Sequence, residues 1–245
     1  LDSNLDIEYS VEPKYDGGGI SLVYQNNQLV RVVTRGDGST GEEITNNGKS
    51  IKSIPLYVDF NKIGISTIEL RGEAIISTKN FAIVNQERLQ SDLPLFANAR
   101  NAATGGLRTK DPKDTESRKM DAFIYTVSYA ADSEGNDVLN KFMTQFETID
   151  TIGRLGIKIP SQARKLCKNI EEVIQFCHLW QDQRATFPYE MDGMVIKLNR
   201  IDWQDQMGFT AHHPRWAIAF KFQAKQAATR LIHIDYQVGK IGSIT

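Results

Sequence analysis

The sequence has only two cysteines, Cys167 and Cys177, and their spacing matches no common metal-ligand motif. We therefore expect neither a disulfide framework nor a zinc site, and the low cysteine content favours a reducing, intracellular setting. Long apolar runs are also missing, since no stretch approaches the roughly 20 residues of a membrane-spanning helix. Charge of one sign is not in excess either, because the formal net charge is −1. Any contact with nucleic acid must then depend on a local basic patch.

The composition is otherwise that of an ordinary globular protein. Hydrophobic residues make up 40% of the chain and charged residues 24%, both near the average for folded domains. A chain of 245 residues is long enough to bury one large core or two small ones. The first residue is not Met, no secretory signal follows, and residues 237–245 still resemble a strand. We therefore expect the natural protein to extend further.

Short runs rich in Val, Ile, Tyr and Phe predict a series of strands. These runs cover residues 6–12, 20–25, 28–34, 67–76, 122–129, 193–198, 216–222 and 230–238. Between the second and third runs, the polar link Tyr24-Gln25-Asn26-Asn27-Gln28 is too short for a helical crossover. It predicts an antiparallel hairpin.

Apolar residues at three- and four-residue spacing predict helices later in the chain. One helix is expected from residue 138 to about Gly153 or Gly156, with Asp137 as its cap, and another over 78–89. Residues 97–109 are compatible with a loop or a short helix. A further helix begins at Asn169, which forms a capping-box pattern with Glu172; its expected apolar face comprises Ile170, Val173, Ile174 and Cys177. The predicted fold class is α+β, with mostly antiparallel sheets, helices on their outer faces and no internal linker.

The segment with the clearest chemical content is Lys14-Tyr15-Asp16-Gly17, where one predicted strand turns into the next. Such a K-x-D-G pattern is weak alone, because chance produces it in roughly one chain in twenty of this length. A solvated hairpin lysine explains it equally well. The pattern gains weight because Glu73, Lys197 and Lys221 also occur in apolar strand segments.

Taken in order, these segments resemble motifs I, III, IV and V of the covalent nucleotidyltransferases. Longer strings are similar to those of the NAD-dependent DNA ligases, and the resemblance spans almost the whole chain. The strings are Thr34-Arg35-Gly36-Asp37-Gly38 with Gly41-Glu42, Phe96-Ala97-Asn98-Ala99-Arg100-Asn101-Ala102-Ala103, and Pro214-Arg215-Trp216-Ala217-Ile218-Ala219-Phe220-Lys221-Phe222. The resemblance implies a nucleotidyltransferase (ATP-grasp-like) fold over residues 1–236, with residues 237–245 beginning a truncated OB-fold domain.

In that family a lysine, here Lys14, attacks the α-phosphorus of NAD, releases nicotinamide mononucleotide and keeps AMP on its nitrogen. The AMP then activates the 5′-phosphate of a DNA nick, which a 3′-hydroxyl seals. Attack requires a neutral amine, which desolvation and neighbouring cations favour. The resemblance assigns this task, and neutralisation of the phosphate charge, to Lys197 and Lys221.

The same resemblance assigns the other nucleotide contacts. Glu12 is expected to contact the adenine amino group, Tyr125 to stack on the base, and Lys197 to lie on the other side of the base. Glu73 is expected at the ribose, Arg35 near the phosphates and Tyr15 beside the nucleophile. Asp16 and Asp192 are expected to orient lysines or Mg²⁺-bound water. The metal ligands themselves stay open, because Mg²⁺ keeps most of its waters. The implied cofactors are therefore NAD and Mg²⁺.

Plainer interpretations exist for several of these residues. Tyr125 alone would be read as a core aromatic, and Arg71 and Asp37 as surface ion pairs. The four histidines, His178, His212, His213 and His233, show no metal spacing and are expected to be structural or exposed. The basic group of Arg100, Arg108, Lys110 and Lys113 fits a solvated face, whereas the resemblance places Arg100 and Arg108 against DNA phosphates.

The implied partner is nicked double-stranded DNA, and the implied protein is a cytoplasmic, nucleoid-associated monomer that does not contact membranes. Three segments depart from the family pattern: Gly18-Gly19, Ala99 and Asn47-Gly48-Lys49. They indicate a divergent source, bacterial or a large DNA virus. The additional glycine predicts a more mobile turn after Lys14.

Two other hypotheses share part of this pattern. An ATP-dependent ligase or a guanylyltransferase has the same motif set, and a catalytically silent relative would only bind nucleic acid. In the family, a preceding helical segment recognises the nicotinamide half of NAD, and further domains follow. We therefore expect this segment to bind adenosine nucleotides, to react poorly with intact NAD and not to seal nicks unaided.

Overall fold

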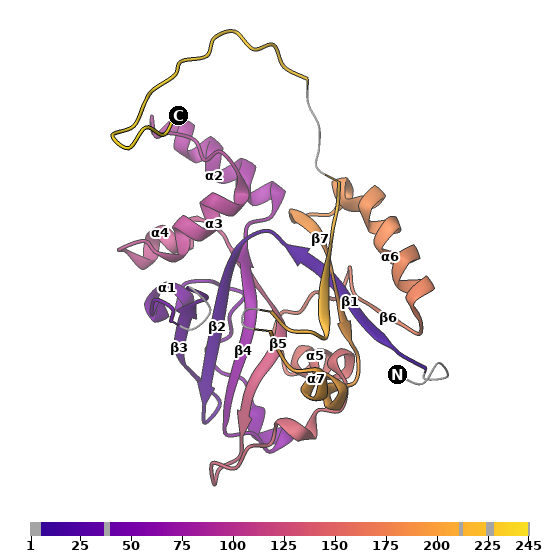
Figure 1. Ribbon diagram of the computed structural model, residues 1–245. Helices are drawn as coiled ribbons and strands as arrows, with labels where there is room; N and C mark the ends of the chain where they lie inside the picture. The colour runs from indigo at the N-terminus through magenta and orange to yellow at the C-terminus, as the bar shows by residue number, and fades with distance from the viewer. Residues whose placement is uncertain (1–5, 37–39, 211–212, 224–227, 245) are drawn as a thin grey trace.

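A computed structural model describes residues 6–36, 40–210, 213–223 and 228–244. Its framework is two four-stranded sheets, in the strand orders β6-β1-β7-β8 and β3-β2-β4-β5, with every pairing antiparallel (Figure 1). The strands are β1 (Tyr9–Tyr15), β2 (Gly18–Gln25), β3 (Gln28–Thr34), β4 (Thr67–Ile75), β5 (Asp121–Ala131), β6 (Lys165–Cys167), β7 (Met191–Leu198) and β8 (Ala217–Lys221). The antiparallel α+β class is confirmed.

Helices lie on either side of the two sheets and between them (Figure 1). They are α1 (Thr45–Lys49), α2 (Thr78–Gln90), α3 (Ala99–Leu107), α4 (Pro112–Ser117), α5 (Gln145–Arg154), α6 (Ile170–Gln183) and α7 (Ile201–Met207), with 3₁₀ turns at Phe60–Ile63, Leu139–Lys141 and Arg184–Thr186. Among the described residues, no helix is long and apolar enough to cross a membrane.

The β3-β2-β4-β5 sheet buries one face in the larger of two hydrophobic cores. Ile20, Leu22 and Leu70 are buried there together with Ala102 and Leu107 of α3. The hairpin between β2 and β3 is confirmed, and Asn26 and Asn27 form its turn with positive φ angles of 47° and 70°. Asparagine tolerates that conformation better than most residues.

Alternation along β1 separates a buried apolar face of the other sheet from a polar one. Val11 packs with Met194 of β7 and with Val173 and Cys177 of α6 in the second core. Residues at alternate positions point to opposite sides of a strand. Ser10, Glu12 and Lys14 therefore belong to the other face, which is the one that carries the charged groups.

Several predicted helix details change in the structure. The helix expected from Asp137 begins only at Gln145, because the Thr144 side chain accepts a hydrogen bond from the backbone N–H of Glu147 and caps it. The segment 97–109 contains a helix, α3, with Asn98 as its cap. The Asn169 cap is confirmed by its hydrogen bond from the N–H of Glu172.

Of the apolar face predicted for that last helix, only half is buried. Val173 and Cys177 lie in the core, whereas Ile170 and Ile174 are 47% and 50% exposed. The strand predicted over 230–238 is wrong, since the described residues there form only an isolated bridge between Val238 and Ile244. The β6 strand was not predicted, because three residues are too few to show a periodicity.

Gly18 and Gly19 also differ from expectation. They lie inside β2, opposite Ala74 and Glu73 of β4, and not in the turn. A Cβ on Gly18 would approach the Leu107 side chain to 2.7 Å. This glycine therefore permits close packing of α3, and the mobility expected of the turn after Lys14 stays a prediction.

Candidate functional site

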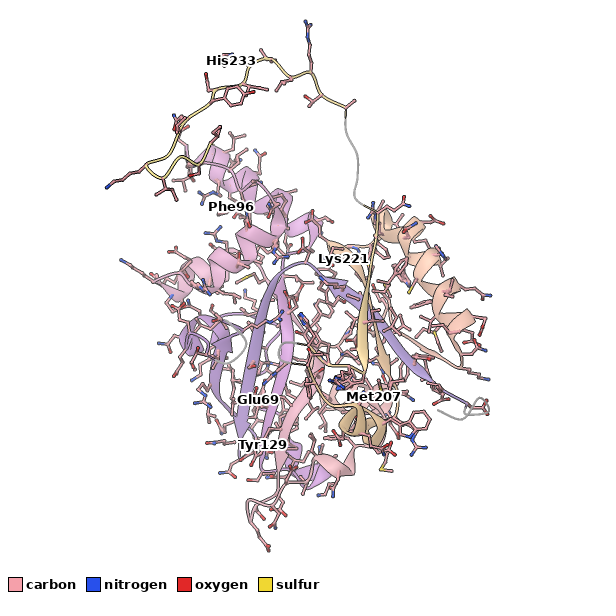
Figure 2. The ribbon with its side chains drawn as sticks, viewed as in Figure 1. Glu69, Phe96, Tyr129, Met207, Lys221 and His233 are labelled. Atoms are coloured by element: carbon pink, nitrogen blue, oxygen red, sulfur yellow. The ribbon has the colours of Figure 1, made fainter. Side chains whose placement is uncertain are left out.

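One row of residues crosses the first sheet at Lys14. The register pairs Lys14 with Gly193 of β7 and Gly193 with Lys221 of β8. Residues opposite one another on paired strands share a face, and Gly193 has no side chain to separate the two lysines. Across two strand spacings their backbones lie about 10 Å apart. Figure 2 shows Lys221 at the end of β8, where the chain leaves the sheet.

The Lys14 amine is held by a carboxylate. Its Nζ lies 2.8 and 2.9 Å from the two oxygens of Asp192, and the two side chains are 29% and 36% exposed. The amine therefore donates to both oxygens of one carboxylate. These contacts with Asp192 must be given up before the Lys14 nitrogen can bond to another atom.

A second ion pair is buried further along the same face. Lys197 Nζ contacts Glu12 Oε1, and their side chains are 6% and 2% exposed. Burial raises the pKa of the Glu12 carboxyl, while the nearby Lys197 ammonium opposes that rise. Lys197 also donates to the backbone carbonyl of Tyr125 at 2.9 Å and to the Thr126 hydroxyl at 3.4 Å.

Tyr125 lies where the ladder between β4 and β5 shifts register, between the pairs Arg71–Thr126 and Gly72–Ile124. Its ring centroid is 5.1 Å from Lys197 Nζ, a cation–π distance. Burial is the main reason that the pKa of its phenol is raised. The irregularity in β5 thus places a neutral aromatic ring beside the Glu12–Lys197 pair.

Glu73 of β4 connects the second sheet to Lys14. Burial raises the pKa of its carboxyl to about 7, against the opposing effects of Arg35, Lys14, Arg100 and a hydrogen bond from the Gly17 N–H. Arg100, near the start of α3, forms an ion pair with Asp16, which lies two residues after Lys14 in the chain. Carboxylates and cations from both sheets therefore converge around Lys14.

Arg108 lies at the other end of α3. Its side chain is 58% exposed and pairs with Glu42 at 3.3 Å. Asn47 donates two hydrogen bonds, to the carbonyls of Leu107 and Thr109, which flank this arginine. The backbone that presents Arg108 is thus anchored to α1.

A family model described as the NAD-dependent DNA ligase adenylation domain matches residues 1–225. The chain belongs to this family. The DNA ligase of Sulfurihydrogenibium sp. (strain YO3AOP1) is 51% identical over 240 residues, 98% of this chain and 34% of that protein. The DNA ligase of Aquifex aeolicus is 46% identical over 239 residues, again 98% of this chain and 32% of that protein.

The adenylation domain therefore spans about a third of the length of the curated relatives that it matches. In three dimensions it is similar to the ligase domain of M. tuberculosis LigD. The TM-score is 0.50 at 13% identity, covering 87% of this chain and 55% of that chain. At that identity the likeness concerns the fold alone, and it agrees with the nucleotidyltransferase fold predicted from the motifs.

Within the adenylation domain, the two lysines expected beside the predicted nucleophile Lys14 lie at different distances from it. Lys221 lies across Gly193 from Lys14. Lys197 pairs with Ser10 in register, four residues along β1 and about 13 Å away at the backbone. The structure therefore places Lys197 with Glu12 and Tyr125, and not beside the Lys14 amine.

The Tyr15 ring packs among other aromatic side chains. Its side chain is buried on the reverse face, with its ring centroid 4.8 Å from that of Phe123 and 6.2 Å from that of Tyr189. A cavity of about 660 Å³ is lined by these three rings together with the charged side chains of Asp150, Arg154 and Lys158. Tyr15 thus supports β1 through its aromatic packing, and its expected place among the nucleotide contacts stays a prediction.

Two residues near the site were missed by sequence reasoning, Thr126 and Arg164. Thr126 accepts a hydrogen bond from Lys197, and Arg164 acts electrostatically on Glu12. Neither belongs to a motif string, and only the strand register reveals them. Of the predicted residues, Asp37 and His212 lie outside the described part of the chain.

Proposed function

We propose that this domain transfers AMP from NAD to Lys14. The amine loses its proton, its nitrogen bonds to the α-phosphorus, and the bond from that phosphorus to the bridging oxygen breaks. Nicotinamide mononucleotide leaves with those bonding electrons, and lysyl-AMP stays on the domain. Lys221 neutralises charge on the phosphate from its position across Gly193.

The observation that carries this proposal is the shared face of the first sheet. It presents Lys14 and Lys221 at one end and the buried Glu12–Lys197 pair beside Tyr125 at the other. A nucleotide bound along it would bring its base to Glu12, which accepts from an amino group, and to the Tyr125 ring. Its phosphates would then reach the lysine row, with Glu73 and Arg35 between.

Mg²⁺ would fit this site as an ion bound mainly by the phosphates of the nucleotide. The described residues contain no group of three or more His, Cys, Asp or Glu side chains that could hold a metal ion. Asp192, Asp16 and Glu73 supply single carboxylates near Lys14, which suits an ion that keeps its waters and binds mainly to substrate phosphates. Such an ion would neutralise charge on the diphosphate.

We further propose that the whole ligase passes this AMP to the 5′-phosphate of nicked DNA. Exposed Arg108 on α3 would contact the duplex backbone, and Arg100 would do so once released from Asp16. The domain would act within a bacterial cytoplasm, as a monomer. We place the domain itself at residues 1–236 and the start of an OB-fold domain at residues 237–245.

Labelling tests the first step. The domain, in molar excess over the nucleotide, is incubated for several hours with NAD, ATP or GTP. Each nucleotide is labelled in its α-phosphate. Acid-labile label on the protein and its intact mass are then recorded. We expect slow gain of one adenylyl group from NAD, absent in Lys14→Ala and in Lys14→Arg. Label from ATP or GTP instead would indicate the other nucleotidyltransferases, and label that survives Lys14→Ala would exclude Lys14 as the nucleophile.

A further inference from the structure

Glu12 has a cation on each side. On one side β7 brings Lys197 into its ion pair. On the other, β6 pairs antiparallel with β1 in the register Tyr9–Cys167, Ser10–Leu166 and Val11–Lys165. One further step in this register places Arg164 directly opposite Glu12, and residues opposite one another share a face.

Arg164 is fixed and buried. Its side chain is 2% exposed, and its guanidinium pairs with Asp150 Oδ1 at 3.0 Å, lies 3.8 Å from the Phe146 ring centroid and donates to the Phe146 carbonyl. Its Nε has no hydrogen-bond partner among the described residues. A buried arginine in so many contacts is a rigid positive charge and not a solvated side chain.

One of the two carboxylate oxygens of Glu12 has no hydrogen-bond partner among the described residues. Oε1 contacts Lys197, whereas Oε2 is buried without a hydrogen-bond partner in the described chain. An ionised carboxylate only accepts hydrogen bonds, whereas a protonated one also donates. The charge state of Glu12 therefore decides whether a buried amino group or a buried carbonyl oxygen fits beside it.

We propose that Arg164 is a specificity-determining positioning residue, which together with Lys197 keeps Glu12 an anionic acceptor and so selects 6-amino over 6-oxo purines. The inference rests on the proposed function, in which Glu12 faces the purine ring. The pKa of Glu12 is raised on balance because burial outweighs the two cations, and Lys197 and Arg164 limit that rise. Asp150 offsets part of the Arg164 charge, and Tyr125, the other titratable group beside the pair, stays neutral.

Binding of AMP and IMP measures this selectivity without any catalytic step. The two nucleotides differ at the purine 6-position, and isothermal titration of the domain gives the ratio of the IMP to the AMP dissociation constant. We expect wild type to prefer AMP, and Arg164→Gln to reduce the ratio about threefold to tenfold, within the usual range of coupling between neighbouring residues. Arg164→Lys keeps the charge and should restore most of the ratio.

Two controls separate electrostatics from folding. Lys165→Gln removes a charge from the neighbouring residue of β6, whose side chain is directed to the other face, and should leave the ratio unchanged. Asp150→Asn removes the carboxylate that shares Arg164 and should keep or raise the ratio. Thermal melts show whether each variant is folded. If Arg164→Gln does not fold, the dissociation-constant ratios of Arg164→Lys and Asp150→Asn still test the inference.

Equal weakening of AMP and IMP by Arg164→Gln would overturn the inference, because a purely structural role affects both nucleotides alike. A lower ratio in Asp150→Asn would overturn it as well. If wild type itself shows no preference for AMP, the adenine site of the proposed function fails instead. The two failures are therefore distinguishable.

Discussion

The Nζ of Lys14 lies within hydrogen-bond distance of both carboxylate oxygens of Asp192, although 178 residues separate them in the chain. Both side chains remain about one-third exposed. An ion pair that water reaches contributes little to stability, because solvent screens it and ordering two side chains costs entropy. The pair is therefore available to be broken when a substrate arrives.

The first prediction concerns the stability of Lys14→Ala. We expect the free energy of unfolding to change by less than about 1 kcal/mol, since an exposed pair of this kind rarely contributes more. Urea unfolding followed by circular dichroism measures it. A loss of several kcal/mol would show that Lys14 has a structural role, and that missing label in this variant reports unfolding.

Lys197 should behave in the opposite way. Lys197→Met leaves the Glu12 carboxylate buried beside an apolar group, and breaking a buried pair from one side typically costs about 3–5 kcal/mol. Lys119→Met is the matched control, because the Lys119–Glu87 pair is 38% and 53% exposed and should contribute less than about 1 kcal/mol.

The double variant Glu12→Gln with Lys197→Met removes both charges. It should recover most of the stability lost in Lys197→Met. Removing both charges of a buried pair costs less free energy than leaving one of them buried without its partner. Urea unfolding of Lys197→Met, Glu12→Gln and the double variant gives the coupling free energy between the two residues. Equal losses in Lys197→Met and Lys119→Met would contradict the burial of the Glu12–Lys197 pair.

Much of this arrangement could be predicted from sequence, and the reasons for success and failure are physical. Lys197 and Lys221 follow apolar alternation, so their strands were recognisable. The register that places Gly193 between Lys14 and Lys221 depends on contacts between distant segments, which local patterns do not encode. Arg164 precedes a strand of three residues and has no periodic signal of its own.

Local competition explains the displaced helix start. Asp137 was predicted as a cap, and its side chain does accept from the N–H of Leu139. That contact produces only a short 3₁₀ turn, and Thr144 caps the α-helix that follows. Two good capping residues seven positions apart cannot be ranked from the sequence, because tertiary packing chooses between them.

Glu73 predicts a pH dependence of stability. Burial raises the pKa of its carboxyl to about 7 from an ordinary 4.5. Between these values the folded state holds a proton that the unfolded state has lost, so stability falls as the pH rises through this window and levels off above it. The loss is at most about 3.5 kcal/mol, since each pKa unit corresponds to about 1.4 kcal/mol.

Glu73→Gln carries no titrating group at this position. The difference in unfolding free energy between wild type and Glu73→Gln should therefore move in favour of the variant between pH 5 and pH 7.5. Urea unfolding at the two pH values measures this change. A constant difference would show that the folded protein leaves the Glu73 carboxyl with its ordinary pKa.

Arg108 predicts the salt dependence of duplex binding. If its guanidinium contacts a DNA phosphate, Arg108→Ala should weaken binding to nicked duplexes of any sequence and lower the slope of log affinity against log salt by about 1. Fluorescence anisotropy across a salt series measures it. Lys165→Ala, a charge removed from the edge strand β6, should leave the slope unchanged, and equal effects of both variants would indicate a non-specific contribution of charge.

Gly193 tests the geometry of the lysine row. A Cβ at this position would lie 2.1 Å from the Phe220 carbonyl oxygen, a backbone atom that can move only if β8 moves. We expect Gly193→Ala to loosen β8 from β7, which raises hydrogen exchange over residues 217–221. Lysyl-AMP formation should fall by at least about tenfold, because Lys221 loses its position opposite Lys14.

Gly105→Ala is the matched control for this substitution. Gly105 lies in α3, and a Cβ there meets nothing within 4 Å. Alanine in a helix is more stable than glycine by roughly 0.5–1 kcal/mol, so this variant should be slightly stabilised and fully active. If Gly193→Ala instead keeps both wild-type exchange in β8 and wild-type lysyl-AMP formation, neither the close approach of β8 to β7 nor the placement of Lys221 opposite Lys14 matters to the first chemical step.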